Sequence, residues 1–295
     1  MHLARRFAFA VLASAALLAL PGIADAHLYN GTLSVKTYDL VLNPHSQGGV
    51  SIACPSADRI LDGGGFWHMP GGNQVVDSGP VIDSSPVSAG GTAVRWVADA
   101  YNRTNSVSDF KVVLLCLPST AFGSAYTLIT KDVPFSAAGS AGGYLKCPTG
   151  TKVATGGAYL HAAYPPGPFA YVRASTPTLD GNGWYAYGTA DGPITLTIAA
   201  VCLSPTVIGT VSFHTSNKVP NGQQLLVTVK CSSGQRIVTG GVFWHKVGNP
   251  ALDSTVAGEI DGGYALPSGR GWRAMVYNDL SYADAEVVAI CVKLP

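Results

Sequence analysis

The fifteen-residue stretch CPTGTKVATGGAYLH occupies Cys147–His161, and the chain carries the same pattern twice more. Cys54–His68 reads CPSADRILDGGGFWH, and Cys231–His245 reads CSSGQRIVTGGVFWH. Each copy begins with Cys, has Gly-Gly at its tenth and eleventh positions, an aromatic residue at its thirteenth and His at its end. A motif that recurs at regular intervals indicates a fold assembled from repeated units.

The chain contains six cysteines, two in each copy of the repeat, and an even number is typical of an oxidising compartment. If each repeat closes on itself in the same way, the pattern predicts three disulfides. These are Cys54–Cys116, Cys147–Cys202 and Cys231–Cys291. Because no C-x-x-C pair is present, a zinc site built from cysteines is disfavoured.

The first 26 residues have the pattern of a secretory signal peptide. Arg5 and Arg6 precede an apolar run, and Ala24-Asp25-Ala26 forms a small-residue cleavage site. We therefore expect a secreted or periplasmic protein that begins at His27 and has no membrane span. Without Arg5, Arg6 and Asp25, the 18 basic and 17 acidic residues become 16 of each. This neutral balance disfavours a nucleic-acid or anionic-lipid partner.

The remainder of the chain predicts an all-β fold of three repeats, at residues 27–120, 121–206 and 207–295. Each repeat contains about six short segments of strand character, separated by turns rich in Gly and Pro. One of these segments begins with Trp in every repeat, at Trp96, Trp184 and Trp272, and we expect these rings in the core. The links between repeats are short, which predicts packed repeats. Two arrangements fit: a β-prism-like object with pseudo-threefold symmetry, or three small sandwiches in a row.

The Cys-to-Gly-Gly unit, the later Trp followed six residues on by Asn102 or Asn278, and the closing strand that ends in Cys carry a resemblance. Together they resemble repeats of secreted bacterial proteins whose role is poorly defined. The threefold Cys-rich layout is similar, more distantly, to the β-prism of vitelline membrane outer layer protein. The resemblance implies a Greek-key prism and an extracellular, carbohydrate-related role. It identifies no catalytic residue.

The three repeat histidines, His68, His161 and His245, are candidate metal ligands. In a pseudo-threefold fold they lie on a ring, and three inward-facing imidazoles could bind zinc or copper. The alternative is that each His forms a local hydrogen bond and recurs only because the repeat was duplicated. His27 is a further candidate, because an N-terminal His can hold copper through its amino group and ring, as in the histidine brace of lytic polysaccharide monooxygenases.

Aromatic residues near polar loops are candidate sugar ligands, since a ring face stacks on the apolar face of a pyranose. Trp67, Trp244 and Tyr159 are the predicted binding residues, and Tyr185 and Tyr187 belong to the same wider set. The Gly-Gly pairs lack the Lys-Ser/Thr of a phosphate loop and predict a bulge or close strand packing instead.

These patterns favour a protein without catalytic residues or cofactor, a binding or structural module with an extracellular glycan or cell-surface component as its partner. No repeated Asp or Glu indicates a hydrolase. The alternative function is a metalloprotein that binds copper or zinc through His27 or the three repeat histidines.

Overall fold

A computed structural model describes residues 33–68, 81–88, 94–122, 126–160, 170–208, 211–215, 219, 223–246, 259–278 and 283–293. The fold is all-β, which confirms the predicted fold class. Each of the three predicted repeat ranges contains six strands. The predicted signal segment and His27 lie outside the described residues.

The strands of the first predicted range are β1 (Ser34–Leu42), β2 (Ser46–Ala53), β3 (Asp58–His68), β4 (Val81–Ser88), β5 (Val94–Asn102) and β6 (Ser108–Pro118). Those of the second are β7 (Thr127–Phe135), β8 (Gly139–Lys146), β9 (Lys152–Leu160), β10 (Ala170–Pro177), β11 (Gly183–Ala190) and β12 (Ile194–Leu203). Those of the third are β13 (Val211–Thr215), β14 (Gln223–Lys230), β15 (Gln235–Lys246), β16 (Glu259–Ala265), β17 (Gly271–Asn278) and β18 (Ala283–Lys293). Two short helical turns, η2 (Ser119–Ala121) and α1 (Pro205–Ile208), link one range to the next. No helix in the described ranges is long and apolar enough to cross a membrane.

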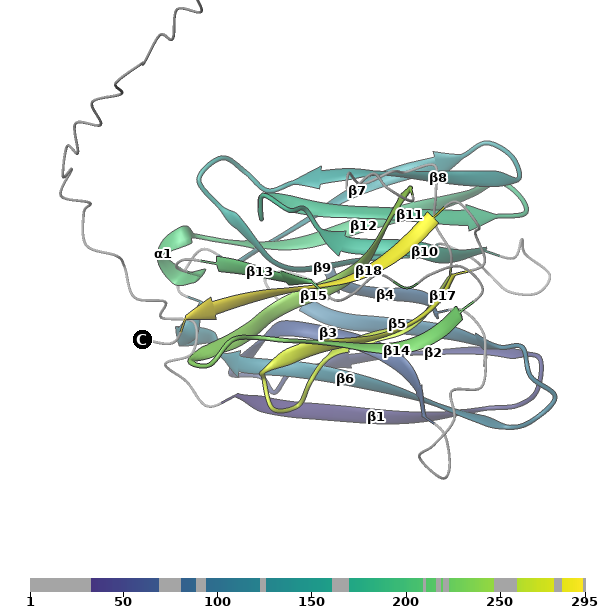
Figure 1. Cartoon of the computed structure of the whole chain (residues 1–295), viewed down its shortest axis with the longest axis horizontal. Helices are drawn as coiled ribbons and strands as arrows, with labels where there is room; N and C mark the ends of the chain where they lie inside the picture. Colours follow the sequence, from purple (N-terminus) through teal and green to yellow (C-terminus); the bar gives the residue numbers. More distant parts are fainter. Residues whose placement is uncertain are drawn as a thin grey trace, which may run out of the picture.

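The eighteen strands form three six-stranded sheets, and every sheet combines strands of two repeats. Sheet A has the order β1-β6-β3-β16-β17-β14, sheet B the order β2-β5-β4-β9-β12-β7, and sheet C the order β13-β18-β15-β10-β11-β8. In Figure 1, β1 runs along the bottom of the view, β7 and β8 along the top, and β15 and β18 between them. The predicted alternative of three separate sandwiches is therefore wrong, because no sheet belongs to a single repeat.

Within one repeat, the two groups of three strands pack face to face. In the first repeat a cluster of buried side chains fills this space, with Leu42 from β1, Ile60 from β3, Trp96 from β5 and Phe110 from β6. Alternation along the strands explains the layer, since every second residue of β5 from Trp96 onward is buried. The predicted core position of Trp96, Trp184 and Trp272 is confirmed.

All three predicted disulfides are present. Each joins the end of one strand to the other layer of the same repeat, so each also links two different sheets. Cys54–Cys116 links sheets B and A, Cys147–Cys202 links C and B, and Cys231–Cys291 links A and C. Closing a loop of about 60 residues contributes about 4 kcal/mol in the chain-entropy model. The three bonds therefore fasten all three sheets to one another.

Candidate functional site

The predicted metal ligands are only partly described. His245 is buried near the end of β15, and its Nε2 lies 3.5 Å from Oε2 of Glu286 on the neighbouring β18. His68 ends β3, but its side chain, like all of His161 and His27, lies outside the described residues. Among the side chains that are described, no three His, Cys, Asp or Glu gather as metal ligands. The metal hypothesis therefore stays a prediction.

Two of the predicted sugar-binding residues, Trp67 and Trp244, are buried and so present no ring face to a ligand in solvent. Their exposed fractions are 5% and 1%. The Trp67 ring packs against Phe110, with 5.1 Å between ring centroids, and Trp244 donates its Nε1–H to the carbonyl of Arg173 at 2.7 Å. Both rings are therefore buried, and each contacts a residue of a neighbouring strand. Tyr159, the third predicted binding residue, is half-buried near the end of β9.

Three aromatic side chains that reach the surface lie on one face of β8, β10 and β11. We call this face, formed by Tyr144, Tyr171 and Tyr187 with Ser140, Thr189 and Arg173, the tyrosine face. Tyr144 is 45% exposed, and Tyr171 and Tyr187 are half-buried. The strand register places Tyr144 opposite Tyr185, and the two rings lie 4.8 Å apart.

The sequence of β11 produces this face by strict alternation. Trp184 and Ala186 are buried on one side, while Tyr185, Tyr187 and Thr189 point to the other. Across the strand pair, Gly142 lies opposite Tyr187, and a Cβ at Gly142 would be 2.8 Å from Cδ2 of that ring. The glycine therefore leaves room for the Tyr187 ring to lie against the sheet.

The opposite face of the same strands packs on the other layer of the repeat. A Cβ at Gly143 would lie 3.7 Å from Val133 on β7 and 3.9 Å from Ile198 on β12. Ser140 and Thr189 are hydrogen-bonded through their hydroxyls at one end of the tyrosine face. Since β8 is the edge strand of sheet C, the face also borders a strand edge, where Lys131 Nζ donates to the carbonyl oxygen of Tyr144 at 3.2 Å.

A second site lies where the three repeats meet. Oδ1 of Asp62 on β3 accepts hydrogen bonds from Thr155 on β9 at 2.7 Å and from Thr239 on β15 at 3.1 Å. These three residues occupy the same ninth position of the repeated stretch, and we call them the axial cluster. Each follows a β-bulge, at Leu61, Ala154 and Val238, where the register shifts by one residue. The bulges turn three equivalent side chains toward one point.

Asp62 is fully buried, and its second oxygen, Oδ2, has no hydrogen-bond partner in the described structure. Burial in the core raises the pKa of this carboxyl well above its ordinary value, against the opposing effect of the hydrogen bonds from Thr155, Gly63 and Thr239. A comparison of the three copies at position nine could have singled out this residue, because the other two copies both have Thr there and the first has Asp.

A cavity of about 50 Å³ lies among the three repeats, and the residue that follows each member of the axial cluster in the sequence lines it. The first glycine of each Gly-Gly pair and the three core tryptophans line it, namely Gly63, Gly156, Gly240, Trp96, Trp184 and Trp272. A Cβ at any of these glycines would come within 2.4 Å of the facing indole. The second glycine allows neighbouring strands to approach, since a Cβ at Gly64 would lie 1.8 Å from the carbonyl oxygen of Gly263. The predicted close packing at the Gly-Gly pairs is confirmed.

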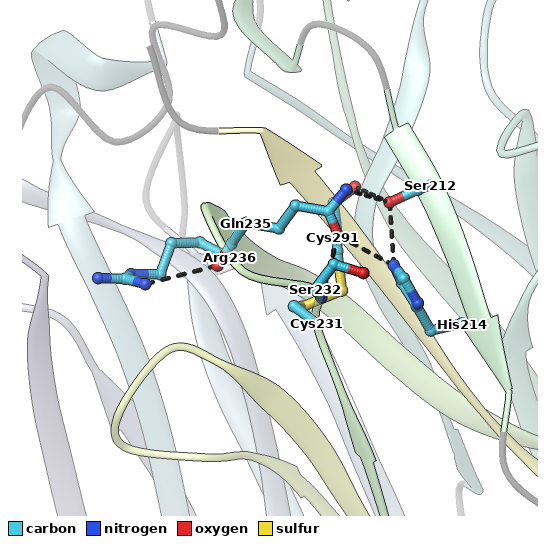
Figure 2. Close-up of a disulfide and its surroundings, with 7 residues drawn as sticks. All are labelled: Ser212, His214, Cys231, Ser232, Gln235, Arg236 and Cys291. Carbon is cyan, nitrogen blue, oxygen red and sulfur yellow. Dashed lines mark hydrogen bonds between the residues drawn. A yellow bond between two sulfur atoms is a disulfide. The ribbon is translucent and has the colours of Figure 1, made fainter.

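A polar network beside the Cys231–Cys291 disulfide brings Ser212 and His214 together (Figure 2). The backbone N–H of Ser232 donates to Gln235 Oε1, which fixes the orientation of that amide, and Gln235 Nε2 donates to Ser212 Oγ. His214 Nε2 lies 2.9 Å from Gln235 Oε1, so this nitrogen carries the proton and donates it. It therefore cannot act as a base toward Ser212, and the network braces the disulfide instead of forming a nucleophilic dyad.

The tyrosine face and the axial cluster are thus the two candidate sites, one open to solvent and one enclosed. Neither offers the paired nucleophile and base that a catalytic assignment would need. No protein-family model matches the chain, and no curated protein is significantly similar to it.

Proposed function

We propose that the protein is an exported, disulfide-stabilised β module that binds glycans through the tyrosine face. Three disulfides that join different sheets suit an oxidising compartment outside the cytoplasm. They also support a rigid frame, and a rigid frame lowers the entropic cost of holding side chains ready for a ligand.

The observation that carries this proposal is that the exposed Tyr144 shares one sheet face with the half-buried Tyr187 and Tyr171. An aromatic ring presents an apolar surface of the size of a pyranose face, and nearby hydroxyls can bond the hydroxyls of the sugar. Ser140 and Thr189 provide such hydroxyls at the end of the face. The glycan site therefore moves from the buried Trp67 and Trp244 to the outer surface of the second repeat.

Glycan-array screening, followed by titration calorimetry with the best ligand, tests the proposal. Tyr144→Ala and Tyr187→Ala should each weaken binding about tenfold, because each removes a stacking surface worth about 1 kcal/mol or more. Tyr38→Ala is the matched control, since Tyr38 is equally exposed, at 45%, but lies on β1 in sheet A. Removal of the Tyr38 ring should leave the affinity for the glycan unchanged.

Three outcomes would contradict the proposal. The array could show no glycan ligand, the two tyrosine variants could bind as well as the wild type, or the Tyr38 variant could lose binding to the same degree. Self-association that Tyr144→Ala abolishes would instead assign the tyrosine face to contact between copies of this chain.

A copper or zinc site at His27, His68, His161 and His245 is the alternative proposal. Its structural support is the carboxylate of Glu286 beside His245, because a carboxylate can serve as a ligand or orient an imidazole. Metal analysis of the processed chain distinguishes this alternative, since the glycan proposal requires no bound metal.

We also propose that the fold is a β-prism. Its support is the equivalence of the three sheets, each of which joins β-strands of one repeat to those of the next, and the meeting of three equivalent side chains in the axial cluster.

A further inference from the structure

Two of the core tryptophans differ in how their indole N–H groups are satisfied. Trp184 donates its Nε1–H to Ser175 Oγ on the neighbouring strand β10, at 2.9 Å. Trp272 is 6% exposed, and its Nε1 is buried without a hydrogen-bond partner in the described structure. A buried donor that is left unpaired costs the free energy of removing it from water, so we expect a partner for Trp272.

The strand register shows why the third repeat differs from the second at this point. Where the second and third repeats meet, Ser175 lies opposite Val242. Where the third and first repeats meet, Gly263 lies opposite Gly65. The two pairs are equivalent, because Val242 and Gly65 are both the twelfth residue of the repeated stretch. Gly263 therefore occupies the place of the serine that accepts from tryptophan in the second repeat.

Space for a partner exists beside the unpaired N–H group. A Cβ at Gly263 would lie 3.2 Å from Cζ2 and 3.4 Å from Nε1 of Trp272, and the three atoms nearest to it all belong to this indole ring. Gly263 and Trp272 also line the cavity of about 50 Å³ among the three repeats. The donor of Trp272 therefore borders open space inside the fold.

The lining of this cavity selects a small, neutral hydrogen-bond acceptor. Its polar side chains are Ser175 and the three tryptophans, and none of the residues that line it carries a charge. An ion would therefore lose its hydration without compensation. A water molecule takes up about 30 Å³ in the liquid, so the cavity has room for one water but is too small for a sugar.

We propose that one ordered water molecule binds in this cavity and accepts the hydrogen bond of Trp272 Nε1–H. The water supplies the oxygen atom that Ser175 supplies in the second repeat. Ser175 lines the same cavity, so its hydroxyl, which still has a hydrogen to donate, is a second polar group of the site. Buried waters bind in this way to polar groups that would otherwise be unsatisfied. The site lies inside the fold and does not depend on glycan binding.

Exchanging the serine and the glycine between the two repeats tests this proposal. Gly263→Ser places a hydroxyl beside Trp272 and should displace the water. Ser175→Gly removes the partner of Trp184 and should admit a second water. Oxygen-17 magnetic relaxation dispersion counts the waters that stay inside a protein for long times. Compared with the wild type, the first variant should lose one such water, the second should gain one, and the double variant should show no change.

Gly143→Ala is the matched control, since it adds a methyl group to a strand glycine that does not line the cavity. This variant should keep the number of long-lived waters found in the wild type. A high-resolution crystal structure of the wild type gives the position of the water, whose oxygen should lie about 2.9 Å from Trp272 Nε1. Because a hydroxyl that replaces an ordered water also releases it, Gly263→Ser should stabilise the fold.

Three results would overturn this inference. Folded Gly263→Ser could retain as many long-lived waters as the wild type, or the crystal structure could show no oxygen within hydrogen-bonding distance of Trp272 Nε1. Wild-type crystals under xenon pressure could also show xenon beside Trp272, because xenon binds in dry apolar cavities. The two crystal measurements use the wild type, so they decide the question even if the exchanged variants do not fold.

Discussion

The axial region and the tyrosine face have diverged to different degrees among the three repeats. In the axial cavity, the equivalent glycines and tryptophans are the same in all three repeats: Gly63, Gly156 and Gly240 face Trp96, Trp184 and Trp272. On the outer face, equivalent positions differ completely. Where the second repeat has Tyr144, Tyr185 and Tyr187, the first has Ser51, Val97 and Asp99, and the third has Thr228, Arg273 and Met275.

This difference shows which positions packing constrains. At the axis each of these glycines lies against the tryptophan of its own repeat, and a Cβ in its place would come within 2.4 Å of the indole, so no larger residue fits. On the outer face the equivalent positions range from exposed, at Tyr144, to almost fully buried, at Tyr185 and Met275. Where the side chain is exposed, substitution has small effects on stability. A surface that differs between copies of one duplicated unit is therefore where we expect a specific ligand, and the shared interior is where we expect the determinants of the fold.

Gly240→Ala should produce the largest effect, because it adds a methyl group where no space exists. Its Cβ would lie 2.3 Å from Cγ of Trp272 and 2.5 Å from the carbonyl oxygen of Val288. Overpacking of this kind costs about 3 kcal/mol, which urea unfolding would measure. Gly143→Ala is the control, since its nearest neighbour would be the flexible Nζ of Lys131 at 3.4 Å. If both variants were equally stable, the axis would not be the constrained region.

Asp62→Asn should change the pH dependence of stability. Because burial raises the pKa of Asp62 in the folded state above the ordinary 3.8, the folded protein binds this proton more tightly than the unfolded chain. The stabilisation is complete below pH 3.8 and is lost as the pH rises toward the pKa in the folded state.

Urea unfolding of the wild type and of Asp62→Asn from pH 3 to pH 9 measures this contribution. The variant should lose less stability with rising pH than the wild type. Asp99, whose pKa burial also raises, remains in both proteins and cancels from the difference. Parallel curves for the two proteins would show that Asp62 does not titrate differently on folding.

Gly263→Ser should have the smallest effect, and it should be stabilising. Trp184 donates its indole N–H to Ser175 at 2.9 Å, but Trp272 has Gly263 at the corresponding place and its Nε1 has no partner in the described structure. A serine hydroxyl would satisfy this donor and contribute about 1 kcal/mol.

The matched variant Gly263→Ala separates the hydroxyl from the added volume, since a Cβ there would already lie 3.2 Å from Cζ2 of Trp272. Thermal unfolding should rank the serine variant above the alanine variant. The opposite ranking would mean that the third repeat satisfies Trp272 in another way.

The sequence alone predicted the features that depend on local patterns or on the internal repeat. Alternation and turn residues predicted the strands, and the repeated Cys spacing predicted Cys54–Cys116 and its two equivalents. The exchange of strands between repeats could not be predicted, because a repeat that closes on itself and one that pairs with its neighbour bury the same residues. That choice rests on a few contacts between strands, such as Gly263 opposite Gly65.

The candidate site was predicted only in part, for a similar reason. Trp67 and Trp244 lie in strands covered on both faces, so alternation could not show that they are buried. Tyr187 belonged to the predicted aromatic set, whereas Tyr144 and Arg173 became candidates only through the register of β8, β10 and β11. Residues shared by all three copies indicate the fold, whereas Asp62 is distinctive because it departs from the Thr of the other two copies.

The pairing of β3 with β16 joins the first repeat to the last, and this fixes both the number of copies and the order of assembly. An open array of repeats can lengthen by adding units at its ends, but a closed one has no free end at which a fourth unit could be added. Sheet A also remains half-built until β14, β16 and β17 have emerged. A chain synthesised from its N-terminus therefore exposes the edge of β3 until β16 has emerged. Truncation of the final repeat would leave this edge unpaired, and we expect such a chain to aggregate.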